Sequence, residues 1–181
     1  MKICIFCGAA SGNNPKHLEA SRDLMNLFHQ KKIDLVYGGA AIGVMGELAN
    51  TLMSIGGNVY GIIPQRLMNK EVAHPGLTKI HVVKDMHERK KMMYDISDGF
   101  LIYPGGLGTM DELFEILTWR QLGYHQKPIA LYNSDGYYDP LLSFIDHAVK
   151  EGFVSPAHRE LLYVSTSMTD IINYFEQNQK T

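Results

Sequence analysis

The stretch Gly99-Phe-Leu-Ile-Tyr-Pro-Gly-Gly-Leu-Gly-Thr109 decides the fold class, because an apolar run changes into a glycine-rich turn. Residues 99–103 carry no charge, which is typical of a strand that is covered on both faces of a parallel sheet. The residues that follow, 109–122, have the apolar spacing of a helix. The stretch therefore predicts a strand, a glycine loop and a helix, which is the repeating unit of parallel α/β sheets.

The same order recurs along all 181 residues. Strands are expected at 3–7, 34–37, 58–63, 78–83, 99–103, 127–132 and 161–164, and helices at 16–31, 44–55, 86–97, 109–122, 139–151 and 167–177. No linker interrupts the series, so we expect one Rossmann-like α/β domain over residues 1–181, a doubly wound parallel sheet with helices on both faces. Ligands of such sheets bind beyond the carboxyl ends of the strands.

Composition and charge exclude several classes of protein. Hydrophobic residues make up 45% and charged residues 20%, and 17 basic against 19 acidic side chains give a net charge of −2. This balance argues against nucleic-acid binding but leaves room for a small anionic ligand. The first apolar run is broken at Gly8, too early for a signal peptide, and no run is apolar enough to span a membrane. We expect a cytoplasmic protein with neither nucleic-acid nor membrane partners.

Two cysteines, Cys4 and Cys7, have the C-x-x-C spacing of redox and metal sites. They lie in a predicted strand, where residues three apart point to opposite faces, so we interpret them as two separate buried thiols. Two cysteines cannot complete a four-ligand zinc site, and the eight histidines form no H-E-x-x-H motif. We expect neither a metal nor a cofactor.

Three of the predicted strand-to-helix loops are rich in glycine, namely 8–12, 38–46 and 104–109. Glycine lets the backbone approach a ligand, and the helix that follows offers N–H groups to an anion. None is a P-loop, and 38–46 does not match the dinucleotide pattern G-x-G-x-x-G. A mononucleotide or sugar phosphate is therefore favoured; the alternative is that these glycines only permit tight turns and close packing.

On the predicted helix 86–97, Arg89 falls inside the apolar arc, and Lys90 lies at its edge. A core-facing arginine needs a partner or an anion, although a structural salt bridge or a snorkelling side chain would also explain it. On helix 109–122 we expect the stripe with Leu113 and Phe114 to pack on the sheet. Glu112 then lies on the opposite side, which is also apolar and which we expect a second subunit to cover.

A phosphate-sized loop, an arginine and a carboxylate suit the cleavage of a bond in a phosphorylated sugar. The carboxylate can orient water or stabilise an oxocarbenium-like transition state. Fixed cations and N–H dipoles can hold the phosphate and so position the anomeric carbon. A plainer interpretation is that Glu112 only complements the helix dipole, although Asp111 could do that alone.

The segment Pro104-Gly-Gly-Leu-Gly-Thr-Met-Asp-Glu112 matches P-G-G-x-G-T-x-x-E, and the chain thereby resembles the LOG ("Lonely Guy") family. The resemblance extends over most of the chain. Further matching segments are Tyr37-Gly-Gly39 with Gly43 to Gly46, Glu71-Val-Ala-His74, Met86-His-Glu-Arg-Lys90, Thr118-Trp119 and Asp135-Gly-Tyr-Tyr138.

This resemblance implies a Rossmann-like homodimer or higher oligomer that hydrolyses cytokinin riboside 5′-monophosphates to a free base and ribose 5-phosphate. It implies that Arg89 and Glu112 are catalytic. The implied substrate- and phosphate-binding residues are Gly105, Gly106, Gly108, Thr109, Lys90, Glu71, Gly39 and Gly43. The first loop, often C-G-S-S in the family, reads Cys7-Gly-Ala-Ala10 here, which leaves Ser11 as the candidate hydroxyl.

Members of the family have also been labelled possible lysine decarboxylases. That chemistry would require pyridoxal phosphate and a Schiff-base lysine, and no lysine stands in a loop of that kind here. Our leading hypothesis is therefore an N-glycosidase acting on AMP or on N6-modified adenine nucleotides. The alternatives are a nucleotide-binding carrier or sensor without turnover, and hydrolysis of a different ribosyl phosphate.

Overall fold

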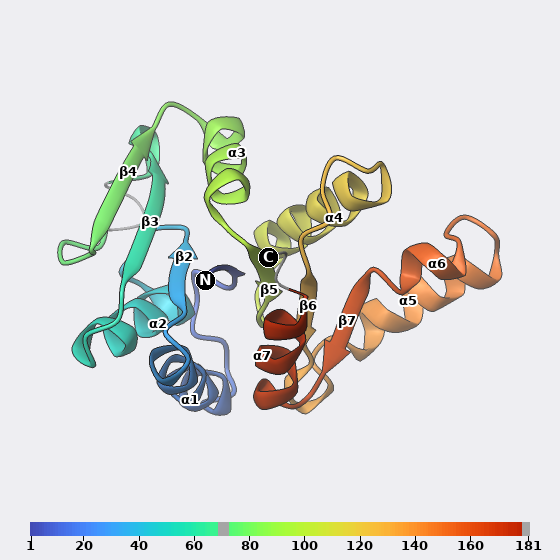
Figure 1. The fold of residues 1–181 in the computed structure, drawn as a ribbon, viewed down its shortest axis with the longest axis horizontal. Helices are drawn as coiled ribbons and strands as arrows, with labels where there is room; N and C mark the ends of the chain where they lie inside the picture. Colours follow the sequence, from blue (N-terminus) through green and yellow to red (C-terminus); the bar gives the residue numbers. More distant parts are fainter. Residues whose placement is uncertain (69–72, 179–181) are drawn as a thin grey trace.

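The fold was analysed on a computed structural model that describes residues 1–68 and 73–178. Its seven strands form one parallel sheet in the order β4-β3-β2-β1-β5-β6-β7 (Figure 1). The strands are β1 (Lys2–Phe6), β2 (Asp34–Tyr37), β3 (Val59–Pro64), β4 (Lys79–Val83), β5 (Gly99–Ile102), β6 (Ile129–Tyr132) and β7 (Leu162–Ser165). The predicted doubly wound parallel sheet is confirmed.

Helices cover both faces of the sheet, as expected (Figure 1). One face carries α1 (Lys16–Gln30), α2 (Gly43–Ser54) and α7 (Met168–Gln177), and the other carries α3 (Met86–Ile96), α4 (Leu107–Gln121) and α5 (Asp139–Lys150). The short helix α6 (Pro156–Arg159) and the turns η1 (Gln65–Leu67) and η2 (Ser134–Gly136) were not predicted, because they are too short to show a period. None of the helices in the described part of the chain is long and apolar enough to cross a membrane.

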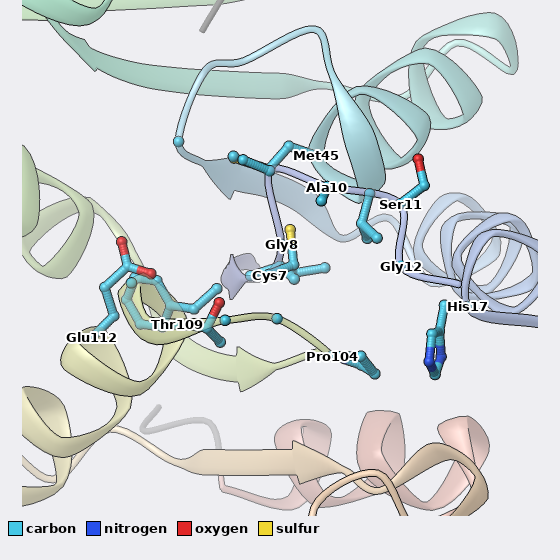
Figure 2. Close-up of a pocket in the computed structure, with 18 of the residues that line it drawn as sticks. Cys7, Gly8, Ala10, Ser11, Gly12, His17, Met45, Pro104, Thr109 and Glu112 are labelled. Carbon is cyan, nitrogen blue, oxygen red and sulfur yellow. The ribbon is translucent and has the colours of Figure 1, made fainter. Parts of the chain in front are cut away.

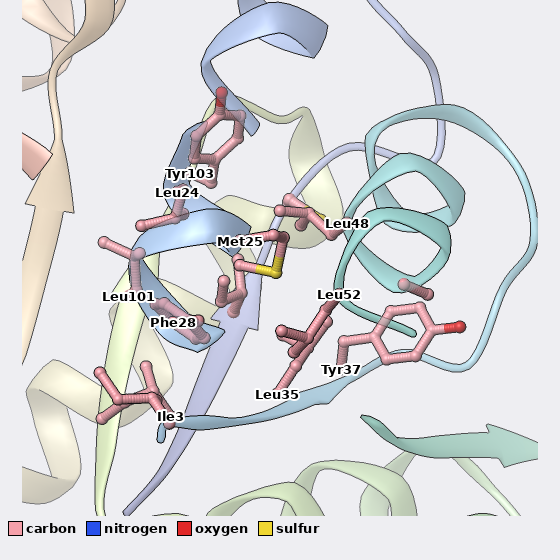
Figure 3. Packing of buried hydrophobic residues seen from close by; sticks show 14 of the residues in the cluster. Ile3, Leu24, Met25, Phe28, Leu35, Tyr37, Leu48, Leu52, Leu101 and Tyr103 are labelled. Atoms are coloured by element: carbon pink, nitrogen blue, oxygen red, sulfur yellow. The ribbon is translucent and has the colours of Figure 1, made fainter. Parts of the chain in front are cut away.

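The sheet separates two apolar cores, which follow from the alternation of side chains along each strand. On one face, Ile3 and Leu101 pack against Phe28 of α1 and its neighbours (Figure 3). Cys7 belongs to this core and Cys4 to the core on the other face. The prediction of two separate buried thiols is confirmed, and burial raises the pKa of both.

The winding of the chain reverses between β1 and β5. From β1 the strands step outward to β4, and the chain then returns to lay β5 against the other side of β1. The loops after β1 and β5 therefore leave neighbouring strands for opposite faces, which opens a crevice between them. The Gly8 N–H donates a hydrogen bond to the Pro104 carbonyl across this crevice at 3.1 Å.

The orientation predicted for helix 109–122 is right in part, because Met110, Leu113 and Leu117 of the predicted stripe pack against the core, and wrong for Phe114 and Ile116. Leu113 and Ile116 of α4 are fully buried, whereas Phe114 is 41% exposed. The helix is apolar on two sides, so its periodicity alone could not choose between them. Glu112 lines a cavity that its own chain forms, on the side of α4 that also carries the buried Ile116.

Candidate active site

A cavity of about 680 Å³ lies at the carboxyl ends of β1, β2 and β5 (Figure 2). Residues from all three predicted glycine loops line it, including Gly8 to Asn14, Gly38 and Gly105. The same cavity is lined by Arg89 from α3 and by Glu112 from α4. The structure thus brings together the two predicted catalytic side chains and the predicted phosphate loop.

The loop between β5 and α4 is tightly folded. A β-carbon on Gly105 would lie 2.1 Å from Thr109 Oγ1 and 2.8 Å from the Gly8 nitrogen, so only glycine fits. The first hydrogen bond of α4 runs from the Met110 N–H to the Gly106 carbonyl at 3.1 Å. The N–H groups of residues 107–109 come before this first hydrogen bond, so they have no acceptor within the helix. The helix dipole favours an anion beside them.

Arg89 is only 6% exposed, as its place in the apolar arc predicts. Its Nη2 donates a hydrogen bond to the Gly38 carbonyl at 3.1 Å, which joins α3 to the end of β2. A β-carbon on Gly38 would lie 2.1 Å from that nitrogen. Sequence reasoning missed Gly38 as the partner of Arg89, since 51 residues separate the two and only the glycine pair at 38–39 hinted at a close approach.

Burial raises the pKa of Glu112 to about 7. The positive charge of Arg89 opposes this rise, and the negative charge of Asp111 adds to it. Smaller contributions come from Lys90, which lowers the pKa, and from Glu115, which raises it. A carboxyl group with such a pKa can hold or release a proton near neutral pH, as acid–base chemistry requires.

Lys90 lies outside the cavity lining. Its Nζ is 2.8 Å from Glu115 and 3.3 Å from Asp111, so it bridges α3 to α4. Burial lowers the pKa of Lys90, but the hydrogen bonds and charges of the two carboxylates raise it overall. In this structure Lys90 therefore contacts carboxylates of α4.

The remaining predicted residues take different positions. Ser11 lines the cavity together with Gly105, Gly106, Gly108 and Thr109. Gly39 and Gly43 lie beside the cavity lining, with φ of +80° and +59°. A β-carbon on Gly43 would lie 2.2 Å from the Ala9 carbonyl, so this glycine allows the first two loops to touch. Glu71 is outside the described residues.

Sequence reasoning missed several side chains of the lining. His17 and Tyr137 line the cavity with edge-to-face rings 5.7 Å apart, and Met45, Met86 and Met93 also belong to the lining. In the sequence, Met86 and Met93 show only the apolar period of a helix, and Met45 lies in the glycine loop 38–46. Tyr137 lies in the segment 135–138, which was noted as a match without a role.

Comparison with known proteins places this chain in a family. The family described as "Possible lysine decarboxylase" matches residues 45–175. Cytokinin riboside 5′-monophosphate phosphoribohydrolase LOG3 of Arabidopsis thaliana is 44% identical over 97% of this chain and 82% of its own length. The cytokinin riboside 5′-monophosphate phosphoribohydrolase of Rhodococcoides fascians is 47% identical over 90% of this chain and 82% of its own.

The chain belongs to the LOG family. The fold of this member is also shared more widely. The molybdenum cofactor binding protein of Rippkaea orientalis superposes with a TM-score of 0.73, over 97% of this chain and 95% of that protein, at 21% identity. At that identity the likeness concerns the fold alone.

Proposed function

We propose that this protein hydrolyses the N-glycosidic bond of cytokinin riboside 5′-monophosphates, and of AMP, to release the base and ribose 5-phosphate. One observation carries the proposal: Arg89, Glu112 and the glycine loop 105–109 line the same cavity. The names of the similar phosphoribohydrolases support the reaction and the substrate class.

In this proposal the N–H groups at the start of α4 and the Thr109 hydroxyl bind the 5′-phosphate. Arg89 stabilises the ribosyl phosphate from the opposite helix, α3. The ionised carboxylate of Glu112 stabilises the cationic sugar and accepts a proton from the attacking water. The C1′–N9 bond breaks and its electron pair leaves with the base, the water oxygen becomes the new hydroxyl on C1′, and the proton that Glu112 took from the water passes to the departing base.

The base is proposed to lie against methionines of the cavity lining, which are Met45, Met86 and Met93. Methionine side chains are flexible and make favourable contacts with aromatic rings, so they suit a purine with or without an N6 substituent. The chain is proposed to act without a metal or cofactor, as one domain over residues 1–181.

A homodimer or larger homo-oligomer in the cytoplasm completes the proposal. Exposed apolar side chains on α4 and at its end support it, because Phe114 of the helix and Leu122 directly after it are 41% and 62% exposed. Apolar side chains on one outer helix face are typical of an interface.

The direct test incubates the protein with AMP and with isopentenyl-AMP and measures released base by chromatography. Wild type should release base, and Glu112→Gln and Arg89→Ala should each lower kcat/KM at least about 100-fold, because both groups act in the transition state. Glu160→Gln, a change at an exposed residue of the same type, is the control and should keep the wild-type rate.

Two outcomes would favour the alternatives. Binding of AMP with no base released from either nucleotide would indicate a carrier or sensor. Release of ribose 5-phosphate only from other ribosyl phosphates would retain the chemistry and reject the adenine nucleotides.

A further inference from the structure

The segment Asp135-Gly-Tyr-Tyr138 has no part in the proposed mechanism, yet both its tyrosines contact the loop that the mechanism uses. The Tyr137 hydroxyl donates a hydrogen bond to the Gly105 carbonyl at 2.7 Å. The Tyr138 hydroxyl donates to the Tyr103 carbonyl at 2.8 Å. The carbonyl between them, that of Pro104, accepts from the Gly8 N–H. Hydrogen bonds therefore fix three successive carbonyl groups of this loop, those of Tyr103, Pro104 and Gly105.

Holding a carbonyl also fixes an N–H group. The peptide unit is planar and trans, so the N–H of the next residue points opposite to the carbonyl. The Tyr137 hydroxyl thus sets the direction of the Gly106 N–H through the Gly105 carbonyl. Gly106 precedes α4 and lines the cavity next to the N–H groups of the proposed phosphate site, so the orientation of this peptide affects that site.

The turn that presents the two tyrosines is itself fixed by short contacts. Asp135 and Gly136 both have left-handed backbones, with φ of +49° and +71°. The Asn133 side chain accepts a hydrogen bond from the Tyr138 N–H at 2.8 Å and donates one to Asp139 at 2.7 Å. A β-carbon on Gly136 would lie 2.5 Å from the Asp139 carboxylate, so glycine is required there.

We propose that Tyr137 is a positioning residue for phosphate recognition, which acts by holding the Gly105–Gly106 peptide in the orientation that binds the 5′-phosphate. The inference rests on the proposed function, because it assumes that this loop binds the phosphate. Tyr137 is 45% exposed, so loss of its hydroxyl leaves the core intact. Tyr138 is 3% exposed and its partner carbonyl is buried, so its hydroxyl contributes mainly to folding.

The test compares Tyr137→Phe with Tyr124→Phe, a matched change at a tyrosine that is 73% exposed. We measure the Kd of ribose 5-phosphate by calorimetry, kcat and KM for AMP, and the thermal midpoint. In Tyr137→Phe, both Kd and KM should rise about three- to tenfold, which is the usual effect of one lost hydrogen bond. The kcat should stay at the wild-type value, since ground and transition states share the phosphate contact. The thermal midpoint should also stay at the wild-type value, because Tyr137 is exposed and its hydrogen bond lies at the surface. Tyr124→Phe should match wild type throughout.

Other results would overturn the inference. Unchanged binding of ribose 5-phosphate by Tyr137→Phe would show that the hydroxyl does not orient the loop. A lower thermal midpoint together with weaker binding would assign Tyr137 a structural role only. Failure of the proposed function would give a different result. Ribose 5-phosphate would still bind in a way that depends on Tyr137, but no nucleotide would release its base. That result would reject the reaction and retain the positioning role.

Discussion

The surroundings of Glu112 disfavour the charged form of its carboxyl group. Burial and the neighbouring Asp111 raise its pKa, and Arg89 only partly offsets them. The sequence identified Glu112 through a nine-residue motif, and it identified Arg89 through a charge inside an apolar arc. It did not reveal the Gly38 carbonyl that binds Arg89, because a backbone partner far along the chain leaves no periodic signal.

Glu112 should therefore destabilise the fold at high pH. The unfolded carboxyl loses its proton near 4.5 and the folded one near 7, so the unfolded state binds fewer protons between these values. Stability then falls as pH rises through this window and is lowest above it. Glu112→Gln removes the effect and should raise the free energy of unfolding at pH 8 by about 1–3 kcal/mol, with little change at pH 4.5.

Urea unfolding of Glu112→Gln and wild type at both pH values measures this difference, with Glu160→Gln as the control that should show none. The same variant should lose activity, so stability and turnover are expected to change in opposite directions. An equal gain in stability at pH 4.5 and pH 8 would contradict a proton-linked origin.

At the scale of elements, α3 and α4 carry Arg89 and Glu112, the proposed catalytic pair, to the same cavity. Their existence, and the inward turn of Arg89, could be predicted from period and composition. The face of α4 could not, because two apolar stripes compete and the choice depends on how the helix meets the sheet. The contact between the two helices could not be predicted either. Lys90 and Glu115 are separated in the sequence by β5, so no helical period links them.

Lys90→Met should weaken this helix pair. Without the ammonium group, Asp111 and Glu115 are like charges four residues apart on α4, which is unfavourable. We expect a loss of about 1 kcal/mol in the free energy of unfolding, measured in urea. Lys91→Met removes an exposed pair within α3 and should change it by less than about 0.5 kcal/mol. Equal effects of the two substitutions would show that the α3–α4 bridge contributes nothing specific.

At the scale of the whole molecule, the fold could be predicted almost entirely, because strand, glycine loop and helix follow one another with little irregular structure. Assembly is a different matter. Phe114 is exposed on α4 and Leu122 directly after it, but a sequence pattern alone does not distinguish an outer apolar side chain from an inner one.

Phe114→Asp should shift the protein toward monomers if this face joins two copies, since a buried charge without a partner is costly. Sedimentation velocity measures the shift. Val82→Asp, at an exposed position on the edge strand β4 at the far side of the sheet, is the control and should leave the mass unchanged. A wild-type mass for Phe114→Asp would move the interface elsewhere.

The hydrogen bond between Gly8 and Pro104 joins the loops that follow β1 and β5, the two strands between which the winding of the chain reverses. It continues the hydrogen bonding between β1 and β5 beyond their last paired residues, Phe6 and Ile102, so the two halves of the sheet stay joined up to the cavity. We therefore expect the entry and exit of a ligand to depend on the exposed residues of the cavity lining, Ser11, Gly12 and Asn13. Insertions or deletions at residues 11–13 should alter the rates at which a ligand enters and leaves the cavity. The pairing of β1 with β5 and the positions of Arg89 and Glu112 should stay unchanged.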